Sequence, residues 1–140
     1  MSNSSDMPSL TTREDVMFFD TDCGGVVHNL AYLRMIEINR TRLGANMGLD
    51  MKKMSDEQLF AVVVRTEADY IRPGKLGDIL RIEGRLDEVG RSTLKFAFEM
   101  FRDSDDTLLL KVRQTLALVK MPEGRPQRTP SEWREKWSTP

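Results

Sequence analysis

The segment 20–29, Asp-Thr-Asp-Cys-Gly-Gly-Val-Val-His-Asn, concentrates the residue types of this chain that could do chemistry. It holds two carboxylates, two adjacent glycines, and the only cysteine and histidine of the sequence. A carboxylate can attack a carbonyl carbon or activate water, and glycines let a substrate approach the backbone closely. This segment is therefore the first candidate for a catalytic or binding site.

The two acids of the segment also have a purely structural explanation. The pattern Asp-x-Asp-x-x-Gly occurs in many turns, where Asp side chains accept hydrogen bonds from nearby N–H groups. We assign Asp20 to that structural role, because a carboxylate at a strand end commonly caps neighbouring N–H groups. The spacing alone leaves Asp22 open between a turn former and a catalytic group. A calcium loop fits poorly, because too few oxygen ligands stand at the required spacing.

A long helix is expected to position this segment. The apolar run 16–19 predicts a strand that stops at the acidic turn, and residues 30–47 then predict one helix. Asn29 is the expected N-cap of this helix, and Gly48 is the expected stop. The first N–H groups of a helix have no partner within it and carry partial positive charge. The acidic turn should therefore lie beside donors that suit a developing oxyanion.

The rest of the chain is predicted to form strands, at 62–70, 79–89, 93–101 and 108–120. In the first of these strands, alternation predicts that one face is formed by Val62, Val64, Thr66, Ala68 and Tyr70. Four strands in a meander, joined by the strand at 16–19, predict a five-stranded antiparallel sheet. The single long helix would cover its apolar face, which is an α+β architecture.

Three segments are expected along the chain. The polar residues 1–12 would form a flexible tail, residues 13–121 the folded domain, and residues 122–140 a C-terminal extension. In the extension, Thr-Pro-Ser-Glu at 129–132 is a capping box, which predicts a short helix over 133–137.

Composition argues against several classes of function. With 140 residues, 39% of them hydrophobic and 31% charged, the chain suits one globular domain. The net charge is -1, and no basic patch indicates a nucleic-acid partner. One cysteine and one histidine exclude an internal disulfide and a Cys/His zinc cluster. Without a signal peptide or a membrane-length apolar run, we expect a cytoplasmic protein with no membrane partner.

A strand ending in Asp-x-Asp-x-x-Gly-x-Val, followed at once by a long helix and an antiparallel sheet, resembles the hotdog-fold thioesterases. The likeness is to the 4-hydroxybenzoyl-CoA thioesterase type and the related Tol-Pal-associated acyl-CoA thioesterases, over roughly residues 13–121. It is carried by Asp20, Asp22, Gly25, Val27, Tyr32, Leu33 and Glu37, and by Tyr-Ile-Arg-Pro at 70–73 with Gly77 and Asp78. The resemblance implies a hotdog fold, with the five-stranded antiparallel sheet wrapped around one long helix. It also implies hydrolysis of an acyl-CoA to free acid and CoA, with no cofactor and no metal.

The resemblance further implies roles for individual residues. Asp22 would act as nucleophile or as general base, and the sequence does not choose between them. The backbone N–H of Gly25 or Val26 would donate to the oxyanion, although Gly25 could also serve only as a left-handed turn residue. Tyr32 would help to shape the acyl pocket. Arg72 is a cation that could meet the phosphates of CoA.

Two roles are possible for each of three further residues, His28, Asn29 and Cys23. In the Tol-Pal-associated relatives a histidine follows the two valines one position further along, where this chain has Asn29. His28 is expected either to contact substrate or to hydrogen-bond at the helix start. Asn29 is expected to cap the helix, or to hold substrate or water through its amide. Cys23 is expected to be a small filler, because the adjacent acids disfavour the thiolate that a nucleophile needs.

Alternatives also remain for the whole protein, because a fold does not prove an activity. A non-catalytic acyl-CoA-binding module is the main one. A hotdog hydratase is a poorer match, since His28 does not have the placement that those enzymes use. The resemblance implies that two protomers join their sheets edge to edge, as a homodimer or homotetramer, with sites between subunits. The acyl group, and the choice between CoA and acyl-carrier protein, stay open.

Overall fold

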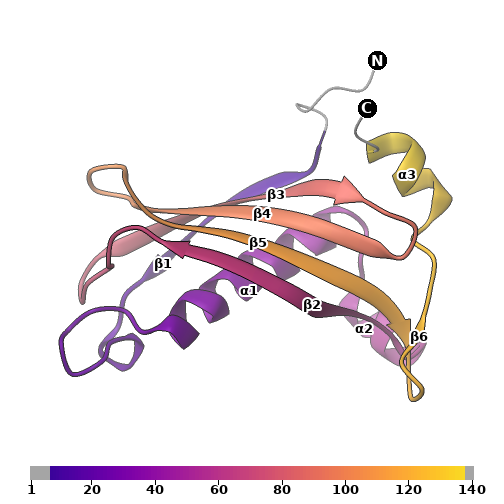
Figure 1. The fold of residues 1–140 in the computed structure, drawn as a ribbon, viewed down its shortest axis with the longest axis horizontal. Helices are drawn as coiled ribbons and strands as arrows, with labels where there is room; N and C mark the ends of the chain where they lie inside the picture. Colours follow the sequence, from indigo (N-terminus) through magenta and orange to yellow (C-terminus); the bar gives the residue numbers. More distant parts are fainter. Residues whose placement is uncertain (1–6, 138–140) are drawn as a thin grey trace.

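An antiparallel sheet curls around one long helix in the computed structural model, which describes residues 7–137 (Figure 1). The strand order is β1-β3-β4-β5-β2, and the short β6 lies beside β5. The strands are β1 Ser9–Asp15, β2 Leu59–Tyr70, β3 Ile79–Val89, β4 Thr93–Arg102, β5 Thr107–Lys120 and β6 Arg125–Pro126. The helices are η2 Phe18–Asp20 (a 3-10 turn), α1 Asn29–Asn46, α2 Met51–Asp56 and α3 Ser131–Trp137. The α+β class expected from the sequence is confirmed.

Helix α1 lies on the concave face of the sheet and packs mainly against β3 and β1 (Figure 1). Its fully buried Met35, Ile36 and Leu43 belong to one core cluster with Ile82 of β3 and Phe98 of β4. The opposite edge of the concave face, formed by β2, has far less cover from α1. A cavity on this side is lined by Gly44 of α1 and Ala61 of β2, and we call the space between these two elements the groove.

The predicted meander of four strands is wrong for β2. Only β3, β4 and β5 follow one another as neighbours, while β2 pairs antiparallel with β5 at the other edge of the sheet. The residues at 71–78 therefore cross from one side of the molecule to the other, and they do not close a hairpin. Two backbone hydrogen bonds hold this crossing segment. At its start the Ile71 N–H donates to Leu109 O of β5 (2.8 Å), and near α1 Gly74 O accepts from the Val27 N–H (2.8 Å).

The predicted inner face of β2 is also wrong in its first half. A bulge between Val63 and Arg65 shifts the register, so that Val63 lies opposite the buried Leu116 of β5 while Thr66 lies opposite Gln114. Val63 therefore shares the concave face with Thr66, and Val62 and Val64 do not. Strict alternation cannot reveal a bulge, because the extra residue resets the period of two.

The N-terminal expectations need two corrections. Strand β1, Ser9–Asp15, pairs with β3, so residues 9–12 are not a tail; residues 1–6 lie outside the described range. The run 16–19 is not a strand, since Phe18 and Phe19 lie in η2 and are 81% and 73% exposed. An apolar run predicts a strand only when a neighbouring surface buries it, and among the described residues only Val16 of this run is buried.

The C-terminal extension closes one end of the core. Trp133 and Trp137 of α3 are buried and belong to the main core cluster. The Thr129 side chain does not make the predicted capping box. Its hydroxyl instead donates to Gly90 O (2.6 Å) at the β3–β4 turn, which ties the extension to the sheet.

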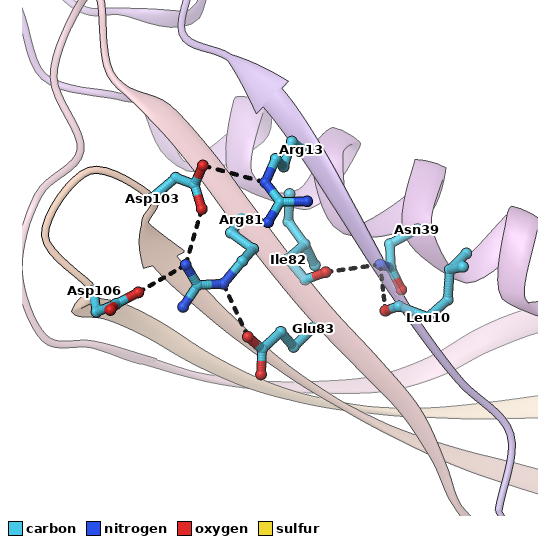
Figure 2. A network of polar contacts seen from close by, with 8 residues as sticks. All are labelled: Leu10, Arg13, Asn39, Arg81, Ile82, Glu83, Asp103 and Asp106. Atoms are coloured by element: carbon cyan, nitrogen blue, oxygen red, sulfur yellow. Dashed lines mark hydrogen bonds and ion pairs between the residues drawn. The ribbon is translucent and has the colours of Figure 1, made fainter.

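The amide of Asn39 fastens α1 to the two strands above it (Figure 2). This fully buried Nδ2 lies within hydrogen-bond distance of Leu10 O (3.1 Å) of β1 and Ile82 O (3.1 Å) of β3. Asn39 Oδ1 lies where a Cβ on Gly84 would be, only 2.1 Å from that position. Glycine at position 84 therefore makes room for the amide.

An ion-pair network on the outer surface joins the same strands to the β4–β5 turn (Figure 2). Arg81 of β3 pairs with Glu83 (2.9 Å), Asp103 (2.9 Å) and Asp106 (2.8 Å), and Arg13 of β1 also reaches Asp103 (3.2 Å). Hydrogen bonding to Arg81 holds the pKa of the Asp103 carboxyl below its usual value. Such solvent-accessible pairs contribute modestly and weaken in salt.

We predict that Gly84→Ala destabilises the fold by about 1–3 kcal/mol, because the new methyl group collides with Asn39 Oδ1. Urea denaturation of the parent, Gly84→Ala, Asn39→Ala and the double variant measures this. The added cost of Gly84→Ala should shrink in the Asn39→Ala background, where the collision with Oδ1 is gone and only the 3.0 Å approach to the Phe98 ring remains. Equal costs in the two backgrounds would contradict the proposed contact.

Candidate active site

The carboxylate of Asp22 lies exposed in a tight turn just before α1. Its Oδ1 accepts from the Gly24 N–H (2.8 Å), and the Gly25 N–H donates to Asp22 O (3.0 Å). Gly25 has φ +74, a conformation that favours glycine. Asp22 Oδ2 has no hydrogen-bond partner among the described residues, so one carboxylate oxygen is available to a substrate or to water.

Asp20 is the buried counterpart of Asp22, with only 1% of its surface exposed. Its Oδ2 accepts from the Met17 N–H (2.9 Å) and its Oδ1 from Arg34 Nη2 of α1 (2.9 Å). Its backbone oxygen accepts from the His28 N–H (3.0 Å). These contacts join η2, the turn and the start of α1, which is the structural role expected from the sequence. The part played by Arg34 was missed, because only the folded chain brings it to Asp20.

His28, and not Asn29, is the N-cap of α1. Its Nδ1 accepts from the Ala31 N–H (3.2 Å), so Nε2 carries the proton that points to Phe19 O (3.2 Å). Both ring nitrogens are therefore occupied within the protein. The sequence suggested Asn29 because Asn is a preferred cap residue, whereas an imidazole nitrogen fills the same place here.

Free backbone donors lie at the start of α1. Among the described residues, the Asn29 and Leu30 N–H groups donate to no partner, as expected for the first positions of a helix. The Val26 N–H also has no acceptor among the described residues, whereas the Gly25 N–H donates to Asp22 O inside the turn. As an oxyanion donor, Gly25 is therefore the weaker of the two residues expected from the sequence.

Two tyrosines hold the crossing segment 71–78 against the start of α1. The buried Tyr32 hydroxyl accepts from the Gly74 N–H (2.8 Å), and burial raises the pKa of Tyr32. Tyr70, at the end of β2, donates its hydroxyl to Asn29 Oδ1, and its ring lies 6.2 Å from that of Tyr32. In this chain Tyr32 thus braces the site, and Tyr70 closes one end of the groove between α1 and β2.

The remaining sequence candidates lie on the surface around the turn. Arg72 and Cys23 are both exposed. The Arg72 guanidinium makes no ion pair within residues 7–137, so it is available to an anion. No group of three His, Cys, Asp or Glu side chains in the described part of the chain is arranged to hold a metal.

Comparison with known proteins identifies the family. The sequence profile of the thioesterase-like superfamily matches residues 16–137. The chain belongs to this superfamily. The acyl-CoA thioesterase YbgC of Haemophilus influenzae is 33% identical over 118 residues, which cover 84% of this chain and 85% of that protein. The acyl-CoA thioester hydrolase YbgC of an Escherichia coli strain is 25% identical over 115 residues, with 82% and 85% covered.

Solved structures agree on the fold of this superfamily member. A protein of Aquifex aeolicus has a TM-score of 0.80 at 28% identity, with 91% of this chain and 98% of that chain covered. A 1,4-dihydroxy-2-naphthoyl-CoA thioesterase of Synechocystis has a TM-score of 0.81 at 19% identity, with 91% and 94% covered. The hotdog fold implied by the sequence resemblance is confirmed. None of the helices within residues 7–137 is both long and apolar enough to cross a membrane.

We predict that His28→Ala lowers the free energy of unfolding by about 1 kcal/mol, the usual effect of removing an N-cap. His28→Asn supplies another acceptor for the Ala31 N–H and should restore most of that stability. Urea denaturation measures both. Thioester hydrolysis by His28→Asn should stay close to that of the parent, and a loss of 100-fold or more would instead assign His28 a direct catalytic role.

Proposed function

We propose that this thioesterase-superfamily protein hydrolyses an acyl-CoA thioester, with Asp22 as the catalytic carboxylate. The observation that carries the proposal is the placement of Asp22, which lies in a glycine turn immediately before the free N–H groups of α1. Thioester hydrolysis needs a nucleophile or base together with donors for the oxyanion, and this turn offers both. The names of the YbgC relatives support an acyl-CoA as the substrate.

Two chemical routes fit the exposed carboxylate. As a nucleophile, Asp22 would attack the thioester carbon, release CoA as the thiolate and leave an acyl anhydride that water then opens. As a general base, Asp22 would take a proton from water while that water attacks the same carbon; the C–S bond then breaks, and CoA leaves as the thiolate and takes up that proton. In both routes the oxyanion would lie at the start of α1, where the Val26 and Asn29 N–H groups are the donors we favour.

The substrate would be held by residues around this turn. Arg72 is an exposed guanidinium suited to a CoA phosphate, and the Asn29 amide, already bonded to Tyr70, borders the groove between α1 and β2. His28 would contribute through the conformation of the helix start, and Tyr32 through the position of the segment that carries Arg72. A cytoplasmic location is part of the same proposal.

We predict that Asp22→Asn lowers kcat for thioester hydrolysis by at least about 100-fold, because the amide neither attacks the carbonyl carbon nor accepts a proton from water. A free-thiol assay with acetyl-CoA, octanoyl-CoA and benzoyl-CoA measures the rates. Asp56→Asn is the matched acid-to-amide control, because Asp56 is exposed at the end of α2. Cys23→Ala should also change the rates little.

The outcomes of this assay separate the alternatives. Undiminished hydrolysis by Asp22→Asn would rule out the proposed mechanism, and a severe loss in Cys23→Ala would point to a cysteine nucleophile. A parent protein that cleaves no thioester, yet gains melting temperature with CoA ligands, would be the non-catalytic binding module.

We further propose that two copies join through their β2 strands, which would complete the site. As an edge strand, β2 has a backbone edge that no other strand within residues 7–137 pairs with, and its Val64 is 58% exposed. Leu30 at the start of α1 is 71% exposed, beside the proposed donors. A second copy would cover these apolar side chains and exclude water from the turn, in a homodimer or a tetramer built from such dimers.

Val64→Lys is predicted to convert the assembly to monomers, because it would place like charges near each other at the twofold contact and leave them unpaired. Light scattering coupled to size-exclusion chromatography gives the mass, and hydrolysis should fall together with it. Thr11→Lys is the matched control, since Thr11 is exposed on β1 at the other edge of the sheet. A parent protein that is monomeric and active would overturn this assembly.

A further inference from the structure

Arg40 carries a positive charge into the groove between α1 and β2. Its side chain is only 14% exposed, and its Nη1 donates to Gln114 Oε1 of β5, whose Nε2 in turn donates to Thr66 Oγ1 of β2 (3.2 Å). The carboxylate paired with it, Glu37, is 66% exposed and lies 3.7 Å from Arg40 Nη2. Burial lowers the pKa of Arg40, because the cation has lost water without a close counter-charge.

A small cavity lies beside this guanidinium. It has a volume of about 160 Å³, and three polar residues, Glu37, Arg40 and Thr41, line it on the helix side. The rest of the lining is mostly apolar and includes Leu49, Ala61, Phe96 and Leu116. An engineered protein cavity of about 150 Å³ holds one benzene molecule, so this cavity could take the end of an acyl group. Glu37 lies 3.7 Å from Arg40 and its side chain is mostly exposed, so an occupant that carries a closer acceptor would stabilise this buried cation further.

The cavity and the start of α1 both face the space between α1 and β2. The Asn29–Tyr70 hydrogen bond marks the end next to Asp22, and Gly44 of α1 and Ala61 of β2 line the cavity at the other. Eleven residues of α1 separate Asn29 from Arg40, or roughly 16 Å along the axis. Helix side chains lean towards the N-terminus, which brings the guanidinium closer to the turn. An acyl group that follows the groove from the thioester would therefore meet Arg40.

We propose that Arg40 selects acyl groups that end in a carboxylate, so that the preferred substrate is the CoA monothioester of a dicarboxylic acid. This inference rests on the proposed thioesterase function. The guanidinium can bind a carboxylate through two parallel N–H···O hydrogen bonds, and the single acceptor from Gln114 leaves N–H groups for them. The terminal carboxylate supplies the counter-charge that Glu37 provides only at a distance.

The test compares two pairs of substrates of equal length, hexanoyl-CoA with adipoyl-CoA and octanoyl-CoA with suberoyl-CoA, as kcat/KM in the free-thiol assay. The parent should prefer the acid-terminated member of at least one pair. Arg40→Met should reduce that preference by about 10- to 100-fold, the effect of losing hydrogen bonds to a charged group. Arg40→Lys should restore part of it, since an ammonium keeps the charge but lacks the planar fork.

Two further variants test whether a lost preference comes from the Arg40 charge or from a general disturbance of the fold. Gln114→Glu keeps Arg40 and adds a competing carboxylate at its partner's position, so it too should reduce the preference. Arg42→Met, exposed on the same helix, should leave both rates unchanged. Parent hydrolysis that is equal or faster with the methyl-terminated substrates overturns the role of Arg40 but not the thioesterase function. Release of thiol from no substrate overturns both.

Discussion

The buried carboxylate of Asp20 is the interaction on which the rest of the site depends. A buried charge is stable only when it is paired and hydrogen-bonded, and Asp20 meets that condition with Arg34 of α1 and the Met17 N–H. Its backbone oxygen also receives the His28 N–H at the helix cap. The turn that presents Asp22 is therefore fixed at both ends. Asp20 therefore holds the backbone, while Asp22, two residues later, stays exposed.

Helix α1 likewise has one face that is attached to the sheet and another that faces the candidate site. On one side, Asn39 attaches α1 to β1 and β3 with a fully buried amide. On the other side, the space towards β2 is bordered by Tyr70 and Arg40 and stays open. Because one face of α1 is rigidly attached to the sheet, the residues on its opposite face keep fixed positions, and a binding site requires such fixed positions.

Local patterns in the sequence predicted the long helix, the three strands from 79 to 120 and the placement of Asp22 beside a helix start, because each depends on residues close together in the chain. The errors have a different origin. Pairing of β2 with β5 and the bulge beside Val63 depend on contacts distant in sequence. His28 took the cap because the Asp20 backbone and Phe19 O position it, and no propensity for a single residue contains that information.

Arg40 shows how local sequence patterns can miss a candidate site residue. On a helical wheel it interrupts an apolar stripe, and its evident partner in the sequence is Glu37, three residues earlier. In the fold that pair is long, and the closer partner is Gln114 on a strand 74 residues away. A buried cation whose nearest contact is neutral is costly for stability, and folding alone gives no reason to keep it. The cost is understandable if the charge binds a ligand, and the cavity beside Arg40 offers space for one.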